Sequence, residues 1–434
     1  MKGNSATADA AAGIFARHRK ILGEGAWVFA GQALSGAFNL GGTRLITQYI
    51  APELYGIANL LQNALVLLRT LFCSPLFAAQ LRYAPDAERG GYRGALLARL
   101  RRILGWATIA MELVAIATGA MWAWRAGGNP LVIAALMFYI FVDVFRTLEM
   151  TALNAARRQR PAALASAAEA LVKPLLVVGA VWLCGPSVTA VLGAIAASIG
   201  LTFVGLLAAR ERGAAGDGRA LPVGFDAELR RYALPLIPAA LLTWITSVSD
   251  RYIVQWLTHD PLGVGVYAAG YGLASQPFLI LQAVIALTLR PVYYSAVSRG
   301  DVVGARRTFR IWLAGAAAAC LVATALIIGW RHQLVSLMLG PKYQDAVVVL
   351  PWIAAGYLFC VIEQVIEQPL LAHKRTGAVL VAQAGGAVAS ILVTVWLVSA
   401  YGMPGAAYAC PVYFLLQGLI AGALVLQPAR QRVA

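Results

Sequence analysis

Long apolar stretches, separated by short polar connections, run along almost the whole chain. At about 1.5 Å per residue, each stretch is long enough to cross a hydrocarbon core of about 30 Å as a helix. The pattern therefore predicts an all-α polytopic membrane protein with twelve transmembrane helices. The predicted spans are Gly25–Ile50, Tyr55–Leu81, Ile103–Trp124, Pro130–Asn154, Ala162–Cys184, Ser187–Ala209, Ala233–Leu257, Gly265–Leu289, Ile311–Trp330, Val347–Ala372, Thr376–Ser399 and Pro404–Leu426.

The composition supports a membrane protein and argues against a nucleic-acid-binding one. The chain of 434 residues is 60% hydrophobic and 12% charged, and its mean hydropathy of +0.72 is outside the range of soluble domains. Its net charge of +16 comes from basic residues in short connections, where they face anionic lipid headgroups. Of the 35 Lys and Arg residues, 27 lie in alternate connections beginning with the N-terminal segment, and 3 lie in the other connections. This bias predicts that both termini face the cytoplasm.

The two halves of the chain repeat each other at an offset of about 207 residues. The stretch 44–50 (RLITQYI) resembles 251–257 (RYIVQWL), and Arg99 recurs as Arg306. Six spans per half give both halves the same orientation, so the repeats are parallel and related by an axis along the membrane normal. Two such lobes enclose a central cavity and rock against each other to move a solute. The predicted parts are a cytoplasmic segment at 1–24, an N-lobe at 25–209, a cytoplasmic linker at 210–230 and a C-lobe at 231–434.

Three arginines inside spans predict a binding site for an anionic headgroup. Arg69 lies near the middle of the second span, too deep to reach the headgroups easily, and Arg44 and Arg251 lie at repeat-equivalent positions near the outer surface. A guanidinium offers a planar, bidentate fork for phosphate, so two lobes could grip a diphosphate from both sides. The alternatives are structural. Arg69 would pair with Asp143, and Arg251 with Asp250, or Arg44 and Arg251 would extend to the outer headgroups.

Two carboxylates in the tenth span predict an ion-coupling site. Glu363 and Glu367 are four residues apart in an apolar setting, where two close carboxylates disfavour double ionisation. This is typical of a site for H⁺ or Na⁺. Asp143 and Glu149 in the fourth span are further candidates. The alternative is that these carboxylates lie near the inner interface and are hydrated.

The remaining titratable residues predict structural roles. Glu169 and Lys173 have the i,i+4 spacing of an intrahelical ion pair. The histidines are scattered, and the cysteines lie within or at the edge of spans without a CxxC motif, so no metal site, cofactor or disulfide is expected. The cysteines are Cys73, Cys184, Cys320, Cys360 and Cys410.

Several stretches resemble a known family of membrane proteins. They are Leu229–Pro238 (LRRYALPLIP), Ser249–Ile253 (SDRYI), Gly265–Ala269 (GVYAA) and Gly340–Tyr343 (GPKY) in the second half, and Ala51–Gly56 (APELYG) in the first. Over nearly its whole length the chain is similar to the bacterial oligosaccharide (polysaccharide-biosynthesis) flippases of the multidrug/oligosaccharidyl-lipid/polysaccharide (MOP) exporter superfamily.

The resemblance implies translocation of an undecaprenyl-diphosphate-linked oligosaccharide across the bacterial inner membrane, for O-antigen, capsule or exopolysaccharide assembly. It also implies a cavity with a cationic lining. The expected partners are the lipid-linked oligosaccharide, the bilayer, H⁺ or Na⁺, and the polysaccharide polymerase machinery. Two alternatives remain open. A cation-coupled multidrug exporter of the same superfamily would prefer an acidic, aromatic-lined cavity, and a polymerase or ligase would need a larger outer loop than these connections provide. A transporter rather than an enzyme is therefore expected.

Overall fold

Helices make up nearly all of the described chain, and no strand occurs in it. The computed structural model describes residues 31, 33–126, 130–156, 158–208 and 219–427. Residues 33–49 form the described part of the first helix. The other elements are α2 (Pro52–Phe72), α3 (Ser74–Gly90), α4 (Arg93–Ala126), α5 (Leu131–Ala155), α6 (Gln159–Cys184), α7 (Val188–Ala208), α8 (Phe225–Ala233), α9 (Leu236–Thr258), α10 (Pro261–Ser298), α11 (Val302–Gly329), α12 (Arg331–Met338), the 3₁₀ helix η1 (Pro341–Val348), α13 (Leu350–Ile366), α14 (Gln368–Ala372), α15 (Thr376–Tyr401) and α16 (Met403–Leu426).

The prediction of an all-α membrane protein with twelve spans is confirmed. Among the described residues, ten helical segments are long and apolar enough to cross a membrane, and α2 with α3 forms an eleventh. The first predicted span lies partly outside the described residues, and its described part is helical. Some helices begin well before their apolar stretch, as α4 does at Arg93 and α11 at Val302. The hydrophobic pattern therefore marks the membrane depth and not the helix ends.

The second span of the first half is broken, while its counterpart in the second half is continuous. The axes of α2 and α3 differ by 49° at Cys73. Pro75 follows at the start of α3 and has no N–H to continue the hydrogen bonds of α2. The counterpart, α10, runs through two prolines without a break. The break ends α2 just after Arg69.

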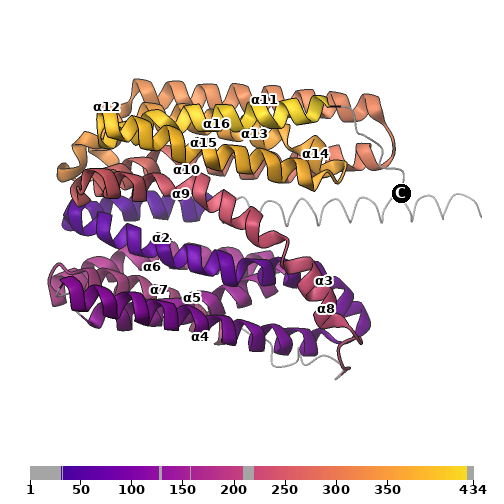
Figure 1. The fold of residues 1–434 in the computed structure, drawn as a ribbon, viewed down its shortest axis with the longest axis horizontal. Helices are drawn as coiled ribbons and strands as arrows, with labels where there is room; N and C mark the ends of the chain where they lie inside the picture. The colour runs from indigo at the N-terminus through magenta and orange to yellow at the C-terminus, as the bar shows by residue number, and fades with distance from the viewer. Residues whose placement is uncertain (1–30, 32, 127–129, 157, 209–218, 428–434) are drawn as a thin grey trace, which may run out of the picture.

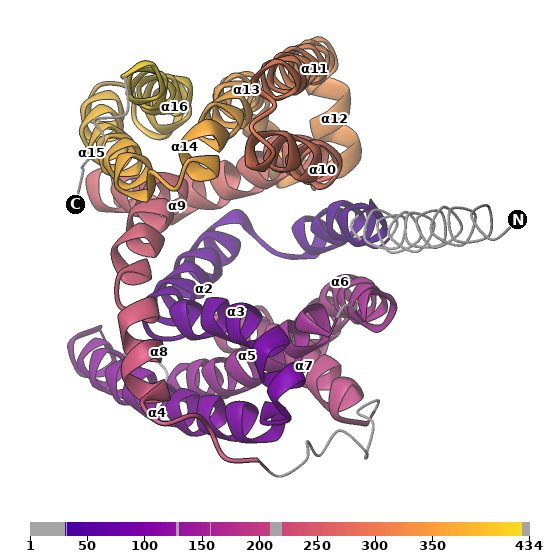
Figure 2. The same ribbon diagram turned by 90° about the vertical axis from the view of Figure 1, so that its right-hand side faces the viewer.

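Each half packs around its own buried apolar cluster. The cluster of the first half includes Leu100, Leu148 and Leu192, and that of the second half includes Tyr267 and Tyr413. Figure 1 shows the two bundles close together at one end and diverging toward the end that carries α8 and α14. Figure 2 shows the same two bundles viewed from that second end. The prediction of two helical halves is thus confirmed, while the exact lobe boundaries stay a prediction.

The described end of the predicted linker contains a helix, α8, that packs against the first half. Helix α8 packs on the first half, where Phe225 belongs to the buried cluster and its ring lies 5.3 Å from the ring of Tyr83, edge to face. The guanidinium of Arg99 in α4 donates to both carboxylate oxygens of Asp226, at 2.9 and 2.7 Å. The chain therefore leaves the first bundle at α8 and crosses to the second along α9 (Figure 2).

Candidate substrate-translocation site

Hydrogen bonds join the two halves at the end where α2, α10 and η1 begin. The Gly340 N–H donates to Thr47 Oγ1 at 2.9 Å, and the Tyr343 hydroxyl donates to the Ile50 carbonyl at 3.0 Å. Thr47, Ile50 and Tyr343 are each at most 1% exposed. Because buried polar groups are costly without partners, these bonds hold the halves in one relative position. We call this contact region, 47–63 with 244–265 and 340–343, the interlobe junction.

Two glycines bring helix backbones into direct contact within the junction. A β-carbon on Gly265 would lie 1.9 Å from the carbonyl oxygen of Pro52, and one on Gly56 would lie 2.3 Å from that of Pro261. Small residues allow such close approach between membrane helices, where packing rather than the hydrophobic effect drives association. The junction is therefore built for a backbone-to-backbone fit between α2 and α10.

The junction extends partway along α2. The Trp244 indole donates to the Asn63 carbonyl at 3.3 Å, and the Tyr252 hydroxyl donates to the Leu60 carbonyl at 2.6 Å. Among the described residues 33–208 and 236–426, the hydrogen bonds between the halves involve only residues 44–63 of the first half. The rest of α2 and all of α3 lie beyond this region, toward the end where the bundles diverge (Figure 1).

Arg44 reaches across to the second half beside the junction. Its Nη1 donates to the carbonyl of Ser336 in α12 at 3.1 Å, and this bond is exposed. The group is accessible and makes one neutral hydrogen bond in the described residues. Its role in headgroup binding remains a prediction. In the structure, Arg44 has a hydrogen-bond partner in the other lobe.

Arg69 forms the ion pair that the sequence offered as its structural alternative. Its Nε lies 3.0 Å from Asp143 Oδ2, and the two side chains are 27% and 12% exposed. The carboxylate predicted for ion coupling and the guanidinium predicted for headgroup binding therefore neutralise each other in this conformation. Tyr139, one turn from Asp143 on α5, accepts a hydrogen bond from Gln62 of α2 at 3.3 Å.

The predicted ion pair between Glu169 and Lys173 is not formed, and that prediction is wrong. Arg146 of α5 instead holds Glu169 in a fork, with Nε to Oε2 at 2.8 Å and Nη2 to Oε1 at 2.5 Å. A guanidinium fork matches a carboxylate better than an ammonium does, so the interhelical pair replaces the intrahelical one. Lys173 lies 3.4 Å from Asn39 Oδ1 and makes no salt bridge among the described residues.

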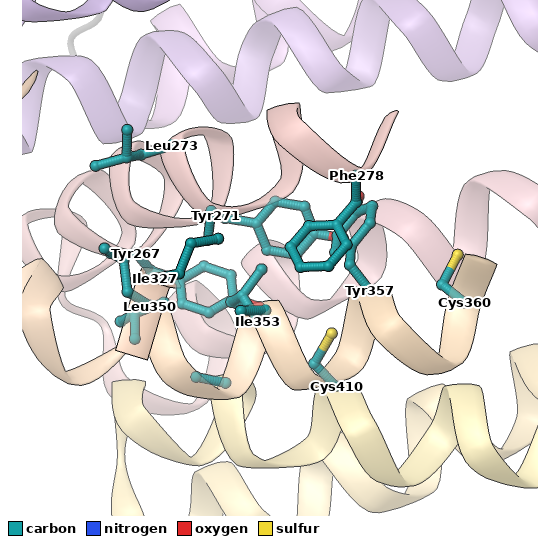
Figure 3. Close-up of a cluster of buried hydrophobic side chains, with 14 of the residues drawn as sticks. Tyr267, Tyr271, Leu273, Phe278, Ile327, Leu350, Ile353, Tyr357, Cys360 and Cys410 are labelled. Carbon is teal, nitrogen blue, oxygen red and sulfur yellow. The ribbon is translucent and has the colours of Figure 1, made fainter. Parts of the chain in front are cut away.

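Arg251 is enclosed within the second half. It is 8% exposed, its Nη1 lies 3.2 Å from Asp250 Oδ1, and its guanidinium carbon lies 4.3 Å from the centre of the Tyr271 ring. The Tyr267 hydroxyl donates to the other Asp250 oxygen at 2.5 Å. Figure 3 shows Tyr267 and Tyr271 in the buried cluster, with Tyr357 nearby. This arrangement matches the structural alternative, in which Asp250 neutralises Arg251.

The acidic candidates occupy different surroundings. Glu149 accepts from Arg101 at 2.7 Å and is thus part of an ion pair. Glu363 and Glu367 are 2% and 8% exposed and have no basic partner within salt-bridge distance in the described chain. Gln417 of α16 donates to Glu363 Oε1 at 3.1 Å, while Glu367 Oε1 has no hydrogen-bond partner among the described residues. The two glutamates form a buried acidic pair, and their role in ion coupling stays a prediction.

A cavity of about 80 Å³ with both apolar and polar lining residues lies in the first half, between helix 33–49, α2, α6 and α7. Its polar lining comes from Asn39, Thr43, Tyr55, Asn59, Gln62 and Lys173. These six residues were not predicted from the sequence to form a site together. The signal was present in the three amides of the first two spans, but whether they line one cavity with Lys173 depends on how four helices are rotated about their axes.

The fold is similar to that of solved transporters. An inward-facing multidrug resistance MATE family transporter of the MOP superfamily matches with a TM-score of 0.74 and 13% identity, covering 91% of this chain and 93% of that one. The lipid II flippase MurJ in an inward closed conformation matches with a TM-score of 0.66 and 14% identity, covering 91% and 86%. An outward-facing MATE family transporter gives 0.61 and 14%, covering 93% and 94%. At these identities the similarity shows a shared fold.

Comparison of the sequence with curated proteins finds no match. The family described as "polysaccharide biosynthesis protein" matches residues 21–297, more than half of the chain. That match covers the first half, the crossing helix α9 and nearly all of α10. The chain therefore belongs to the polysaccharide biosynthesis family, and it is a multi-pass membrane protein with the fold of the solved MOP superfamily transporters.

Proposed function

We propose that this protein flips an undecaprenyl-diphosphate-linked oligosaccharide from the inner to the outer leaflet of the bacterial inner membrane. The product serves O-antigen, capsule or exopolysaccharide assembly. The family match over residues 21–297 carries the proposal, because that family is described by polysaccharide biosynthesis while the fold is that of lipid and drug transporters. The charge bias of the connections supports an orientation with both termini in the cytoplasm.

Alternating access is the proposed mechanism. With the termini inside, the interlobe junction lies on the outer side, and the bundles diverge toward the cytoplasm (Figure 1). The higher TM-score with the inward-facing MATE transporter than with the outward-facing one supports an inward-facing state. The diphosphate-sugar head enters from the inner leaflet, and the polyprenyl tail stays in the lipid. Parting of the junction then exposes the head to the outer side.

The proposed headgroup contacts differ among the three arginines. Arg44 is accessible next to the junction, and Arg69 is about a quarter exposed. Both remain candidates, and Arg69 would exchange Asp143 for phosphate as the lobes move. Arg251 is enclosed by Asp250 and Tyr271, which supports a structural role for it.

The direct test is reconstitution. In proteoliposomes that contain a fluorescent undecaprenyl-diphosphate oligosaccharide, the protein is expected to make lipid from the protected leaflet accessible to an added glycosidase. Protein-free liposomes and liposomes with heat-denatured protein are the controls. Accessibility equal to that of the controls contradicts the proposal, and polymerisation of the sugar by the purified protein supports a polymerase instead.

Glu363 and Glu367 are the proposed coupling site for H⁺ or Na⁺. In the double variant Glu363→Gln/Glu367→Gln the carboxylates are lost at nearly constant volume. We expect flipping to lose its response to an imposed H⁺ or Na⁺ gradient, because the two carboxylates that would bind the ion are gone. Asp345→Asn, an exposed carboxylate in η1, is the matched control. A gradient response equal to that of the unmodified protein assigns coupling elsewhere, with Asp143 and Glu149 as the next candidates.

A cation-coupled multidrug exporter is the second candidate. The buried acidic pair favours this function, because a carboxylate without a basic partner can also bind a cationic drug. The same proteoliposomes loaded with a cationic dye separate the two functions. Dye efflux without flipping of the lipid-linked sugar would select the exporter.

A further inference from the structure

Lys173 is a cation without a counter-ion in the wall of the N-lobe cavity. The carboxylate one turn before it on α6, Glu169, is held by Arg146. Lys173 forms no salt bridge among the described residues, and its hydrogen-bond partner is Asn39 Oδ1 at 3.4 Å. One positive charge is therefore left uncompensated in this part of the membrane, which is costly unless the site serves a ligand or water.

The cavity wall supplies hydrogen-bond donors and no carboxylate. The described lining contains no Asp or Glu. The Asn59 side chain accepts from Asn63 at 2.8 Å through its oxygen, so its NH₂ group remains free to donate. The Asn39 oxygen likewise faces Lys173, which leaves its NH₂ group as a donor. An ammonium with two amide donors matches an oxyanion.

The size of the cavity limits its ligand. A buried water needs about 10–15 Å³, whereas pockets for drug-sized ligands measure roughly 300–1,000 Å³. At about 80 Å³ the cavity has room for one small anion and not for an oligosaccharide. The sugar would have to lie outside it.

From this charge, these donors and this volume we infer that the N-lobe cavity is an anion site that takes one phosphate group, with Lys173 as its cation. The inference rests on the proposed flippase function and deepens it by naming the site of the substrate's diphosphate. Inorganic phosphate offers the same chemistry, so the free ion and the lipid headgroup are both arms of the test. The anion site then lies in the first lobe, and the buried acidic pair lies in the second.

The site is in contact with the interlobe junction. Tyr55 lines the cavity, and its ring lies 6.0 Å from the ring of Tyr343 in the second half, edge to face. Tyr343 also makes the junction hydrogen bond to Ile50. A ligand that displaces Tyr55 therefore changes the packing of the junction itself.

The test measures binding by thermal unfolding of the purified full chain in detergent without chloride. Inorganic diphosphate and undecaprenyl diphosphate are the probes, with potassium gluconate at equal ionic strength as the blank. Each probe is expected to raise the unfolding temperature of the unmodified protein. In Lys173→Gln the affinity should fall about 10- to 100-fold, the loss expected for a charge-assisted hydrogen bond. Lys173→Arg should recover most of it.

Two further variants control for a general loss of positive charge and for misfolding. Lys342→Gln removes an exposed lysine in η1 and should bind as the unmodified protein does. If Lys173→Gln does not fold, Asn59→Leu removes an amide donor and should weaken binding while leaving the charge. Stabilisation by the lipid alone assigns the site to the headgroup, and stabilisation by both probes assigns it to the phosphate group itself. Equal binding by Lys173→Gln and the unmodified protein overturns the inference.

Failure of this inference can be told apart from failure of the proposed function. If the unmodified protein flips lipid-linked oligosaccharide and Lys173→Gln flips it with the same dependence on lipid concentration, the flippase stands and the anion site falls. If the unmodified protein does not flip but binds diphosphate through Lys173, the anion site stands and the flippase falls.

Discussion

Arg251→Ala is expected to lower the free energy of unfolding by about 3–5 kcal/mol, the range found when one partner of a buried ion pair is removed. The variant leaves Asp250, which is 1% exposed, without its cation, and it leaves a void beside the Tyr271 ring. Flipping per folded molecule should change little, because the ion pair and the ring contact of Arg251 both lie within its own lobe. Chemical or thermal unfolding in detergent measures the first effect, and proteoliposome flipping measures the second.

Arg44→Ala is the matched control, because Arg44 occupies the repeat-equivalent position in the first half. It loses one exposed hydrogen bond to the Ser336 carbonyl, so its effect on stability should be within about 1 kcal/mol. In the double variant Asp250→Asn/Arg251→Met the charges are removed together, and much of the lost stability should return. A stable Arg251→Ala protein that fails to flip would reverse this interpretation and make Arg251 a headgroup ligand.

Gly265→Ala is expected to reduce flipping about 10- to 100-fold, because it prevents the interlobe junction from closing. The new β-carbon would lie 1.9 Å from the Pro52 carbonyl oxygen, a backbone atom that cannot rotate away. Overpacking at such a contact costs about 1–3 kcal/mol, which lowers the population of the closed junction by a similar factor. Each transport cycle passes through this state, so the flipping rate should fall with it.

Gly272→Ala is the control for this prediction. It lies about two turns further along α10, and a β-carbon there meets no atom within 4 Å. It changes helix propensity in the same way as Gly265→Ala and leaves the junction intact. Distances between spin labels on α2 and α10 should widen in Gly265→Ala and stay unchanged in Gly272→Ala. A normal closed distance in Gly265→Ala would show that the backbone contact is not required.

The candidate site was harder to predict than the fold. Arg69 and Asp143, and Arg251 and Asp250, were each foreseen as possible pairs, because a buried charge in an apolar span needs a partner. The partner of Glu169 was not foreseen. Arg146 lies 23 residues away in sequence on another helix, and the nearer Lys173 has the spacing of a local pair. Local spacing shows which side chains can meet on one helix and says nothing about a better partner on the next.

The glycines of the interlobe junction also could not be identified from the sequence. Gly56 and Gly265 are two among 42 glycines in the chain. Their sequence context resembles that of Gly272, which packs against nothing at its open face. Only the distance between α2 and α10 tells these positions apart.

The twelve spans, their division into two halves and the predicted side of each connection can be read from the residues alone. These properties follow from the hydrophobicity of contiguous residues and from the charge of short loops, and both are local quantities. Packing of the helices sets which charges neutralise each other, which cation among the described residues lines a cavity without a salt bridge, and where two backbones touch. These features depend on the rotation and tilt of each helix against its neighbours, which are set by packing among residues far apart in the chain.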